Sequence, residues 1–302
     1  MFASPLWVPA VLMAAFFQNL RSLLQKQLSS QLSTGGATLS RFLFAFPLAL
    51  AYACILSAVK GAWPEAIPHA FPFYVAAGAF FQVVATYALL ASFHHGAFAV
   101  GNAYSKTEAL QAVVIGAIIL GEFLSLLAIL AILVGIAGVS MIAFKRREDG
   151  LMALDFRDKA VWYGLASGAM FATASVCFRG AALSFETLDP FVRAGWTLTV
   201  AVGLQTVVLS AFLAWREPGQ VMRTVRAWRT TGFVAVVGVT ASIGWHTAFS
   251  LQTVALVKAL AQIELVFSTI TSWAYFKEPV SLRDVAGIAL IGLSVIMIVL
   301  VA

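Results

Sequence analysis

Two stretches of this sequence resemble one another and decide its fold: residues 102–122, NAYSKTEALQAVVIGAIILGE, and residues 258–278, KALAQIELVFSTITSWAYFKE. Each holds one glutamate before an apolar run and a second glutamate fourteen residues later, namely Glu108 with Glu122 and Glu264 with Glu278. A spanning helix needs about 20 mostly apolar residues, which is the length of both stretches. The sequence therefore predicts an internal duplication built on membrane-spanning helices.

The composition supports a membrane protein. Hydrophobic residues make up 61% of the 302 positions and charged residues 11%, whereas a soluble domain carries roughly 25% charged residues. The net charge of +6 comes from basic residues that lie mainly in short loops between apolar runs, as in membrane topogenesis. This pattern does not favour nucleic-acid binding, and we expect lipid to surround the chain.

Ten apolar runs of spanning length can be traced along the chain. They are separated by Gly, Pro, Ser and Asp turn signals, and they lie at 7–28, 38–59, 72–93, 97–120, 124–144, 160–183, 190–214, 232–253, 255–276 and 284–301.

A polar connection near the middle of the chain divides these runs into five and five. The predicted fold is an all-α integral membrane protein of ten transmembrane helices, with repeats at 1–148 and 156–302. Because five is odd, the two repeats must cross the membrane in opposite senses, which gives the inverted repeat of many secondary transporters.

Several residues of the two halves carry a resemblance to a known family. Arg41 and Arg193 lie near the start of the second run of each half, Gly121-Glu122 and Lys277-Glu278 end the fourth runs, and the fifth runs are rich in glycine. With these features the chain resembles the EamA-type branch of the drug/metabolite transporter superfamily over nearly its whole length. The resemblance implies transport of amino acids, amines, drugs, sugars or lipid-linked intermediates. Where such proteins often have a proline, this chain has Glu108 and Glu264.

The orientation of the termini is predicted differently by two arguments. Loops after the odd-numbered runs carry most of the lysine and arginine residues, so the positive-inside rule places both termini outside. The family resemblance implies that both termini are cytoplasmic.

The strongest candidate site lies in the fourth run of each half. Ionisable side chains inside spans are costly, so they are functional hypotheses by default. Burial favours the uncharged form of a carboxyl group, which suits a glutamate to carry a proton. If the repeats are inverted, Glu108 and Glu264 should face one another near mid-membrane, with Tyr104 on the face of Glu108. Lys106 and Lys258 either share this site or simply neutralise the glutamates.

Polar residues in other runs add weaker candidates. Gln18 and Arg21 fall on one stripe of the first run, and the arginine could either bind a carboxylate or phosphate or lie at the interface as a structural residue. Gln82 lies in the third run, and Trp245 precedes His246 in the eighth. The imidazole of His246 could shuttle protons near neutral pH or act as a packing residue.

These residues favour a secondary active transporter over an enzyme. We expect a proton-coupled exporter of small organic metabolites or drugs, such as an amino acid, amine or other zwitterion, working by alternating access in the bacterial cytoplasmic (inner) membrane. The expected partners are a small-molecule substrate, protons and membrane lipid, in a monomer or homodimer, with no cofactor and no metal. The sequence has no nucleotide-binding loop, His-Glu-x-x-His pair or Gly-x-Ser-x-Gly elbow. A flippase for a lipid-linked intermediate and, less favoured, an intramembrane enzyme are the alternatives.

Overall fold

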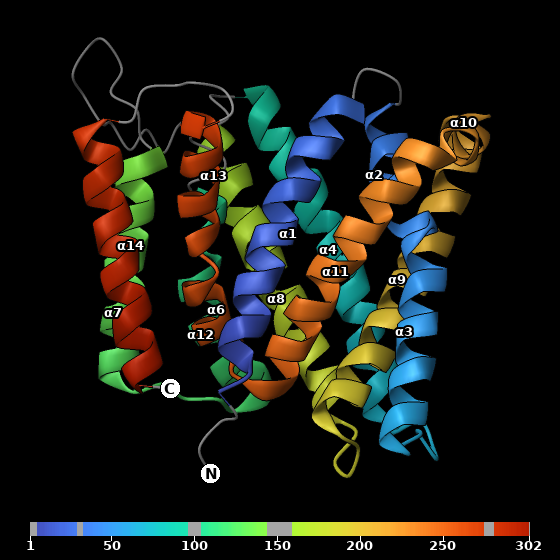
Figure 1. Ribbon diagram of the computed structural model, residues 1–302, viewed down its shortest axis with the longest axis horizontal. Coiled ribbons are helices and arrows are strands. Elements are labelled where there is room, and N and C mark those ends of the chain that lie inside the picture. Colours follow the sequence, from blue (N-terminus) through green and yellow to red (C-terminus); the bar gives the residue numbers. More distant parts are fainter. Residues whose placement is uncertain (1–4, 29–32, 96–103, 144–158, 275–280, 302) are drawn as a thin grey trace. The chain divides into compact units, whose positions relative to one another are not determined.

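A computed structural model describes residues 5–28, 33–95, 104–143, 159–274 and 281–301, and within these ranges every regular element is a helix (Figure 1). The helices are α1 (Trp7–Leu28), α2 (Thr34–Leu43), α3 (Ala45–Lys60), α4 (Ala70–His95), α6 (Glu108–Leu120), α7 (Leu126–Ala143), α8 (Lys159–Leu183), α9 (Pro190–Arg216), α10 (Gln220–Arg226), α11 (Trp228–Leu251), α12 (Val254–Leu260), α13 (Ile263–Ala274) and α14 (Leu282–Val301).

Six stretches of helix are long and apolar enough to cross a membrane: Thr38–Lys60, Ala70–Leu89, Val161–Leu183, Pro190–Arg216, Thr231–Leu251 and Leu282–Val301. Each coincides with one of the predicted apolar runs. Two shorter apolar helices, Glu108–Leu120 and Leu126–Ile142, fall within two more runs. The chain is thus an all-helical membrane protein, while the count of ten spans stays a prediction.

The chain folds into two compact units, each assembled from separate stretches of sequence. The first unit comprises Met1–Val8, Phe80–Val176 and Gln252–Ala302, and the second comprises Pro9–Ala79 and Cys177–Leu251. Helices α4 and α8 each contribute residues to both units. The predicted repeats at 1–148 and 156–302 therefore do not coincide with the compact units, because each unit takes residues from both halves of the sequence.

In the second unit, α9 packs against α3 and α11. Their contact is a cluster of mostly small or β-branched side chains, which lets the helices approach closely: Phe42, Ala45, Ala49, Leu198, Val202, Ala235 and Val239. The buried hydroxyl of Thr199 bonds the carbonyl of Ala49 at 3.0 Å. Asp189 caps the start of α9, and Pro190 at its first position needs no intrahelical N–H partner.

The predicted run 38–59 is divided at Phe44 into α2 and α3. The physical cause lies three residues further on. Pro47 has no N–H with which to bond the carbonyl of Leu43, and its ring crowds that carbonyl. The segment still meets the length and hydropathy of a span, so the proline bends the helix without ending the crossing.

In the first unit, α7 and α14 lie side by side (Figure 1). Gly138 and Gly287 face each other so closely that a Cβ on Gly138 would come within 2.7 Å of the Gly287 carbonyl oxygen. The hydroxyl of Ser294 on α14 bonds the carbonyl of Ala131 on α7 at 2.7 Å. Small residues with an interhelical hydrogen bond are the usual basis of tight helix packing in lipid.

Candidate functional site

The helix predicted over 97–120 is interrupted just before Glu108. Lys106 and Thr107 form a turn, and α6 begins at Glu108. The backbone N–H of Thr107 bonds the carbonyl of Tyr104 at 3.2 Å, and the Thr107 hydroxyl donates to the same carbonyl at 2.6 Å. A threonine that bonds a nearby carbonyl in this way competes with the helical ladder. The prediction that Tyr104 and Glu108 share one continuous helix face was therefore wrong.

A second interruption divides the run predicted over 255–276. Helix α12 ends at Leu260, Ala261 and Gln262 form a turn, and α13 begins at Ile263. Gln262 N–H bonds the Ala259 carbonyl at 3.2 Å, and Glu264 N–H bonds the Ala261 carbonyl at 3.0 Å. Both are short-range turn bonds that take the place of the regular helical ladder.

The charged residues at the two breaks suit the helix ends that carry them. Glu108 and Glu264 lie in the first turns of α6 and α13, and Lys258 lies in the last turn of α12. A helix favours negative charge at its N-terminus and positive charge at its C-terminus. The breaks thus create helix ends where ionised side chains are stabilised within an otherwise apolar chain.

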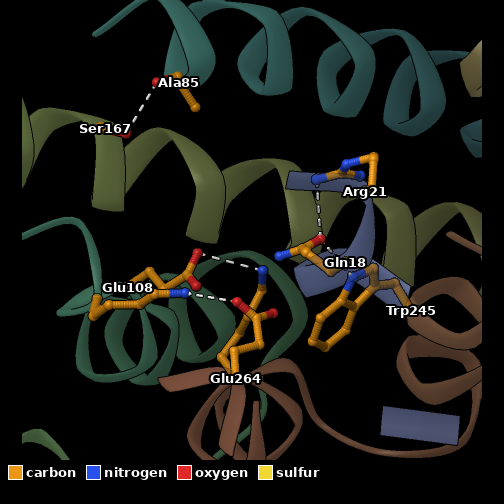
Figure 2. A network of polar contacts seen from close by, with 9 residues as sticks. Gln18, Arg21, Ala85, Glu108, Ser167, Trp245 and Glu264 are labelled. Carbon is orange, nitrogen blue, oxygen red and sulfur yellow. Dashed lines mark hydrogen bonds and ion pairs between the residues drawn. The ribbon is translucent and has the colours of Figure 1, made fainter. Parts of the chain in front are cut away.

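Lys106, Glu108, Lys258 and Glu264 form a charge quartet in the first unit. Lys106 Nζ lies 3.0 Å from Glu264 Oε2, and Lys258 Nζ lies 3.3 Å from Glu108 Oε2. The four side chains expose between 11% and 17% of their surface, so water screens these pairs weakly. Figure 2 shows both pairs as dashed lines beside the labelled glutamates. The structure brings together all four charged residues predicted for this site.

The partners in the quartet are crossed between the two halves of the sequence. Each glutamate is paired with the lysine of the other break, not with the lysine closest to it in sequence. Each lysine thus neutralises a glutamate, but it is the glutamate of the other break. The result is a quartet with no net charge that joins α12 and α13 to α6 and the turn before it.

A glycine on a neighbouring helix makes room for each break. A Cβ on Gly168 of α8 would lie 2.9 Å from the Ser105 carbonyl oxygen and 2.9 Å from Gln111 Oε1. A Cβ on Gly135 of α7 would overlap the amide of Gln262. Gln262 is 2% exposed, and neither polar atom of its side chain has a hydrogen-bond partner among the described residues. Gln262 was not among the residues predicted for the site.

Three further predicted residues meet in the second unit, and Figure 2 labels them. Gln18 Oε1 accepts hydrogen bonds from Trp245 Nε1 at 3.1 Å and from Arg21 Nη2 at 3.4 Å. Arg21 is 7% exposed, and its aliphatic part lies against Gly238 of α11, where a Cβ would come within 3.3 Å of Arg21 Cδ. The arginine is thus buried between α1 and α11 and does not reach outward to an interface.

The remaining candidates occupy separate positions. His246 is buried, with its Nδ1 3.0 Å from the carbonyl of Ser242 and its ring 4.9 Å from that of Phe178. Because a carbonyl only accepts, Nδ1 carries the proton in the neutral ring. Gln82 lies in α4, where the hydroxyl of Thr86 bonds its backbone carbonyl at 2.8 Å.

Two arginines that carry the family resemblance, Arg41 and Arg193, have different surroundings in the structure. Arg193 bonds Ser250 through the hydroxyl at 2.7 Å and the carbonyl at 2.9 Å, and so ties α9 to the end of α11. The guanidinium of Arg41 lies 5.1 Å from the centre of the Phe42 ring. An arginine inside the apolar run 38–59 is costly in lipid, so the sequence itself carries this signal of function.

In the ranges that the structure describes, no group of three or more His, Cys, Asp or Glu side chains is placed so that it could hold a metal ion. The polar groups that do gather are cationic and anionic side chains at helix breaks, together with amide, indole and guanidinium groups. These can bind and release charged or hydrogen-bonding solutes.

Helices long enough to span a membrane, with charged residues at helix breaks, define a multi-pass helical membrane protein. The model of the EamA-like transporter family matches residues 158–300. This match to the second half of the chain confirms the resemblance drawn from the sequence: the chain is similar to the EamA-like transporter family.

The other comparisons concern the fold. A solved structure described only as a crystal structure of protein is similar with a TM-score of 0.68, and the alignment covers 98% of this chain and 97% of that chain. With 16% of residues identical, this similarity establishes a shared fold alone. A comparison with curated proteins gives no match.

Proposed function

We propose that this protein is a proton-coupled secondary transporter that exports small organic metabolites or drugs, with the charge quartet as its coupling centre. The observation that carries the proposal is the pair of crossed ion pairs at two helix breaks, in a chain whose second half matches the model of a transporter family. Broken helices with ionisable residues are a recurrent way to build transport sites in membranes. The setting is the bacterial cytoplasmic membrane, as a monomer or homodimer.

The chemistry follows from charge balance in the quartet. Protonation of Glu108 turns the Lys258–Glu108 ion pair into a neutral acid beside an ammonium group. The quartet then carries one excess positive charge in a weakly screened place, which favours either binding of an anionic group or loss of the proton. Conversely, a substrate ammonium can displace a lysine from its carboxylate. Proton and cationic substrate therefore compete for the same carboxylates, which is the basis of exchange.

The positions of the breaks support an inverted repeat and alternating access. The turn at Lys106–Thr107 precedes Glu108, and the turn at Ala261–Gln262 precedes Glu264. The breaks thus fall next to the two glutamates that the duplication aligns. In our proposal the chain has ten spanning helices, and its two repeats move against one another while the crossed pairs break and re-form.

The test is transport by the purified protein in liposomes with an imposed pH gradient. Amino acids, amines and cationic dyes are offered singly, and uptake is followed with and without the gradient. We expect gradient-driven movement of at least one of them, and loss of that movement in Glu108→Gln, because an amide cannot take up a proton. Gradient-driven transport by Glu108→Gln at the wild-type rate would overturn the coupling role.

A matched control separates coupling from a general effect of losing a carboxylate. Glu186 is an exposed glutamate in the loop before α9, so Glu186→Gln should transport at the wild-type rate. A second variant, Lys106→Glu with Glu264→Lys, reverses one ion pair. If the pair only holds the fold, the reversed pair restores both stability and transport. Under our proposal the reversed pair restores stability but not coupled transport, because the carboxylate then lies at position 106, in the turn before α6, and no longer in the first turn of α13.

A further inference from the structure

The connection between α9 and α11 is a strongly basic part of the chain, with the sequence WREPGQVMRTVRAWR over residues 215–229. Four arginines and one glutamate leave it with three excess positive charges. It joins two stretches that are each long enough to cross a membrane, Pro190–Arg216 and Thr231–Leu251. Because the apolar core of a bilayer ends where such spans end, this connection lies at the level of the lipid headgroups.

The arginine side chains of this connection form an exposed basic surface. All four are exposed, and none forms an ion pair in the part of the chain that the structure describes. The acidic side chain among them, Glu217, accepts a hydrogen bond from the hydroxyl of Ser33. Carboxylates in the described ranges therefore do not balance the positive charge of this surface. The four residues are Arg216, Arg223, Arg226 and Arg229.

Tryptophan side chains accompany the first and the last of these arginines. Arg216 Cζ lies 5.3 Å from the centre of the Trp215 ring, and Arg229 Cζ lies 5.6 Å from that of Trp228. The two tryptophans are 75% and 58% exposed. Tryptophan is enriched at the boundary between hydrocarbon and headgroups. The two Trp–Arg pairs thus place cations next to side chains that prefer this boundary.

Helix α10, the short helix inside the connection, has an inverted distribution of side chains. Its buried residues are polar, namely Gln220 and Thr224, whereas Met222 and Val225 are 54% and 40% exposed. A surface helix next to water normally buries its apolar residues. The two exposed apolar residues lie on α10 beside two of the arginines. An outer surface that is both apolar and cationic suits contact with acyl chains and acidic headgroups.

Contacts with neighbouring segments hold α10 in place. It packs against α2, and the hydroxyl of Thr231 on α11 donates to the carbonyl of Thr224 at 3.3 Å. Gly219 has a φ of +87°, a conformation that favours glycine, and it forms the turn from α9 into α10. A surface that is ordered before binding loses less freedom when a ligand binds.

We propose that the connection between α9 and α11 is a binding surface for acidic phospholipid. The guanidinium groups of Arg223 and Arg226 bind phosphate oxygens of the headgroup through paired N–H···O bonds, and Met222 and Val225 contact the adjoining acyl chains. A surface with excess positive charge attracts lipids that carry a net negative charge. This interaction is separate from solute transport and does not rest on the coupling role of the quartet.

The experiment compares two lipids with identical acyl chains on the delipidated protein in neutral detergent. Phosphatidylglycerol carries a net negative charge, and phosphatidylcholine carries none. Native mass spectrometry follows binding of the first lipid molecule as the lipid concentration rises. We expect the wild type to bind phosphatidylglycerol more tightly. Arg223→Gln with Arg226→Gln should weaken that binding about tenfold or more, because each arginine near an acidic lipid contributes roughly a fivefold factor.

Two further variants separate binding by these arginines from a general effect of charge. Arg283→Gln is the control for Arg226→Gln alone, because Arg283 is also an exposed arginine, at the start of α14, but lies beside Asp284. It should leave phosphatidylglycerol binding unchanged. Arg223→Lys with Arg226→Lys keeps the charge but loses the paired geometry, so it should bind phosphatidylglycerol more weakly than the wild type. Since the arginines are exposed, all variants should keep the wild-type melting temperature in lipid-free detergent.

Several outcomes would overturn the proposal. Equal binding of the two lipids by the wild type would show that the surface does not select acidic headgroups. Unchanged phosphatidylglycerol binding by the double glutamine variant would show that the lipid binds elsewhere. Glycerol 3-phosphate carries the anion without acyl chains; if it binds as tightly as phosphatidylglycerol and is lost in the same variant, the surface binds soluble anions and the assignment to lipid is wrong. None of these measurements involves transport, so the coupling proposal stands or falls separately.

Discussion

Replacing Glu264 by glutamine removes one carboxylate of the quartet and keeps nearly the same shape. In the wild type, Lys106 Nζ lies 3.0 Å from Glu264 Oε2, and the two side chains are 17% and 13% exposed. After the change, the ammonium group of Lys106 faces a neutral amide in a poorly solvated place. We predict that Glu264→Gln destabilises the folded protein.

The magnitude follows from the burial of the pair and its neighbour. An exposed pair contributes about 0–1 kcal/mol, whereas breaking a buried pair on one side costs about 3–5 kcal/mol. Lys106 also interacts with Glu108, which compensates part of the lost charge. We therefore expect the lower end of that range, about 3 kcal/mol. The double variant Lys106→Gln with Glu264→Gln leaves no lone charge and should recover most of this loss.

The assay is reversible unfolding in mixed micelles with increasing SDS, for the wild type, the two single variants and the double variant. The four unfolding free energies form a cycle whose interaction term belongs to the pair. We expect a coupling of about 2–3 kcal/mol with both single changes destabilising. A single-variant loss below about 0.5 kcal/mol, as for a solvated surface pair, would show that the reasoning on burial is wrong.

Two further predictions concern glycines in the first unit. Gly138→Ala forces a Cβ to within 2.7 Å of the Gly287 carbonyl and should cost about 1–3 kcal/mol of unfolding free energy through overpacking. In the same SDS titration, Gly292→Ala should cost nothing, since no atom lies within 4 Å of its Cβ position; equal losses in both would contradict this. Gly168→Ala pushes on the carbonyl of Ser105 at the first break, so liposome uptake should fall more steeply than stability. Unchanged uptake would show that the turn tolerates displacement.

Much of the fold could be predicted because its causes are local. Apolar runs of spanning length gave six of the spans directly, and the pairing of Glu108 with Glu264 at equivalent positions pointed to the quartet. The kink at Phe44 was also available in principle, since Pro47 removes a helical donor. Run 255–276 was predicted as one helix, because turns such as that at Gln262 are compatible with helix propensity and arise from packing against neighbours such as Gly135.

The sequence by itself determined that this is a helical membrane protein, because apolar composition is a property of the chain alone. The internal duplication stays a prediction from the spacing of the glutamates. Only the tertiary structure decided which lysine pairs with which glutamate. Lys106 and Glu264 are 158 residues apart, and their pairing depends on how four helix segments pack. Ion pairs depend on distance and burial, and neither quantity is set by sequence spacing once the residues lie on different helices.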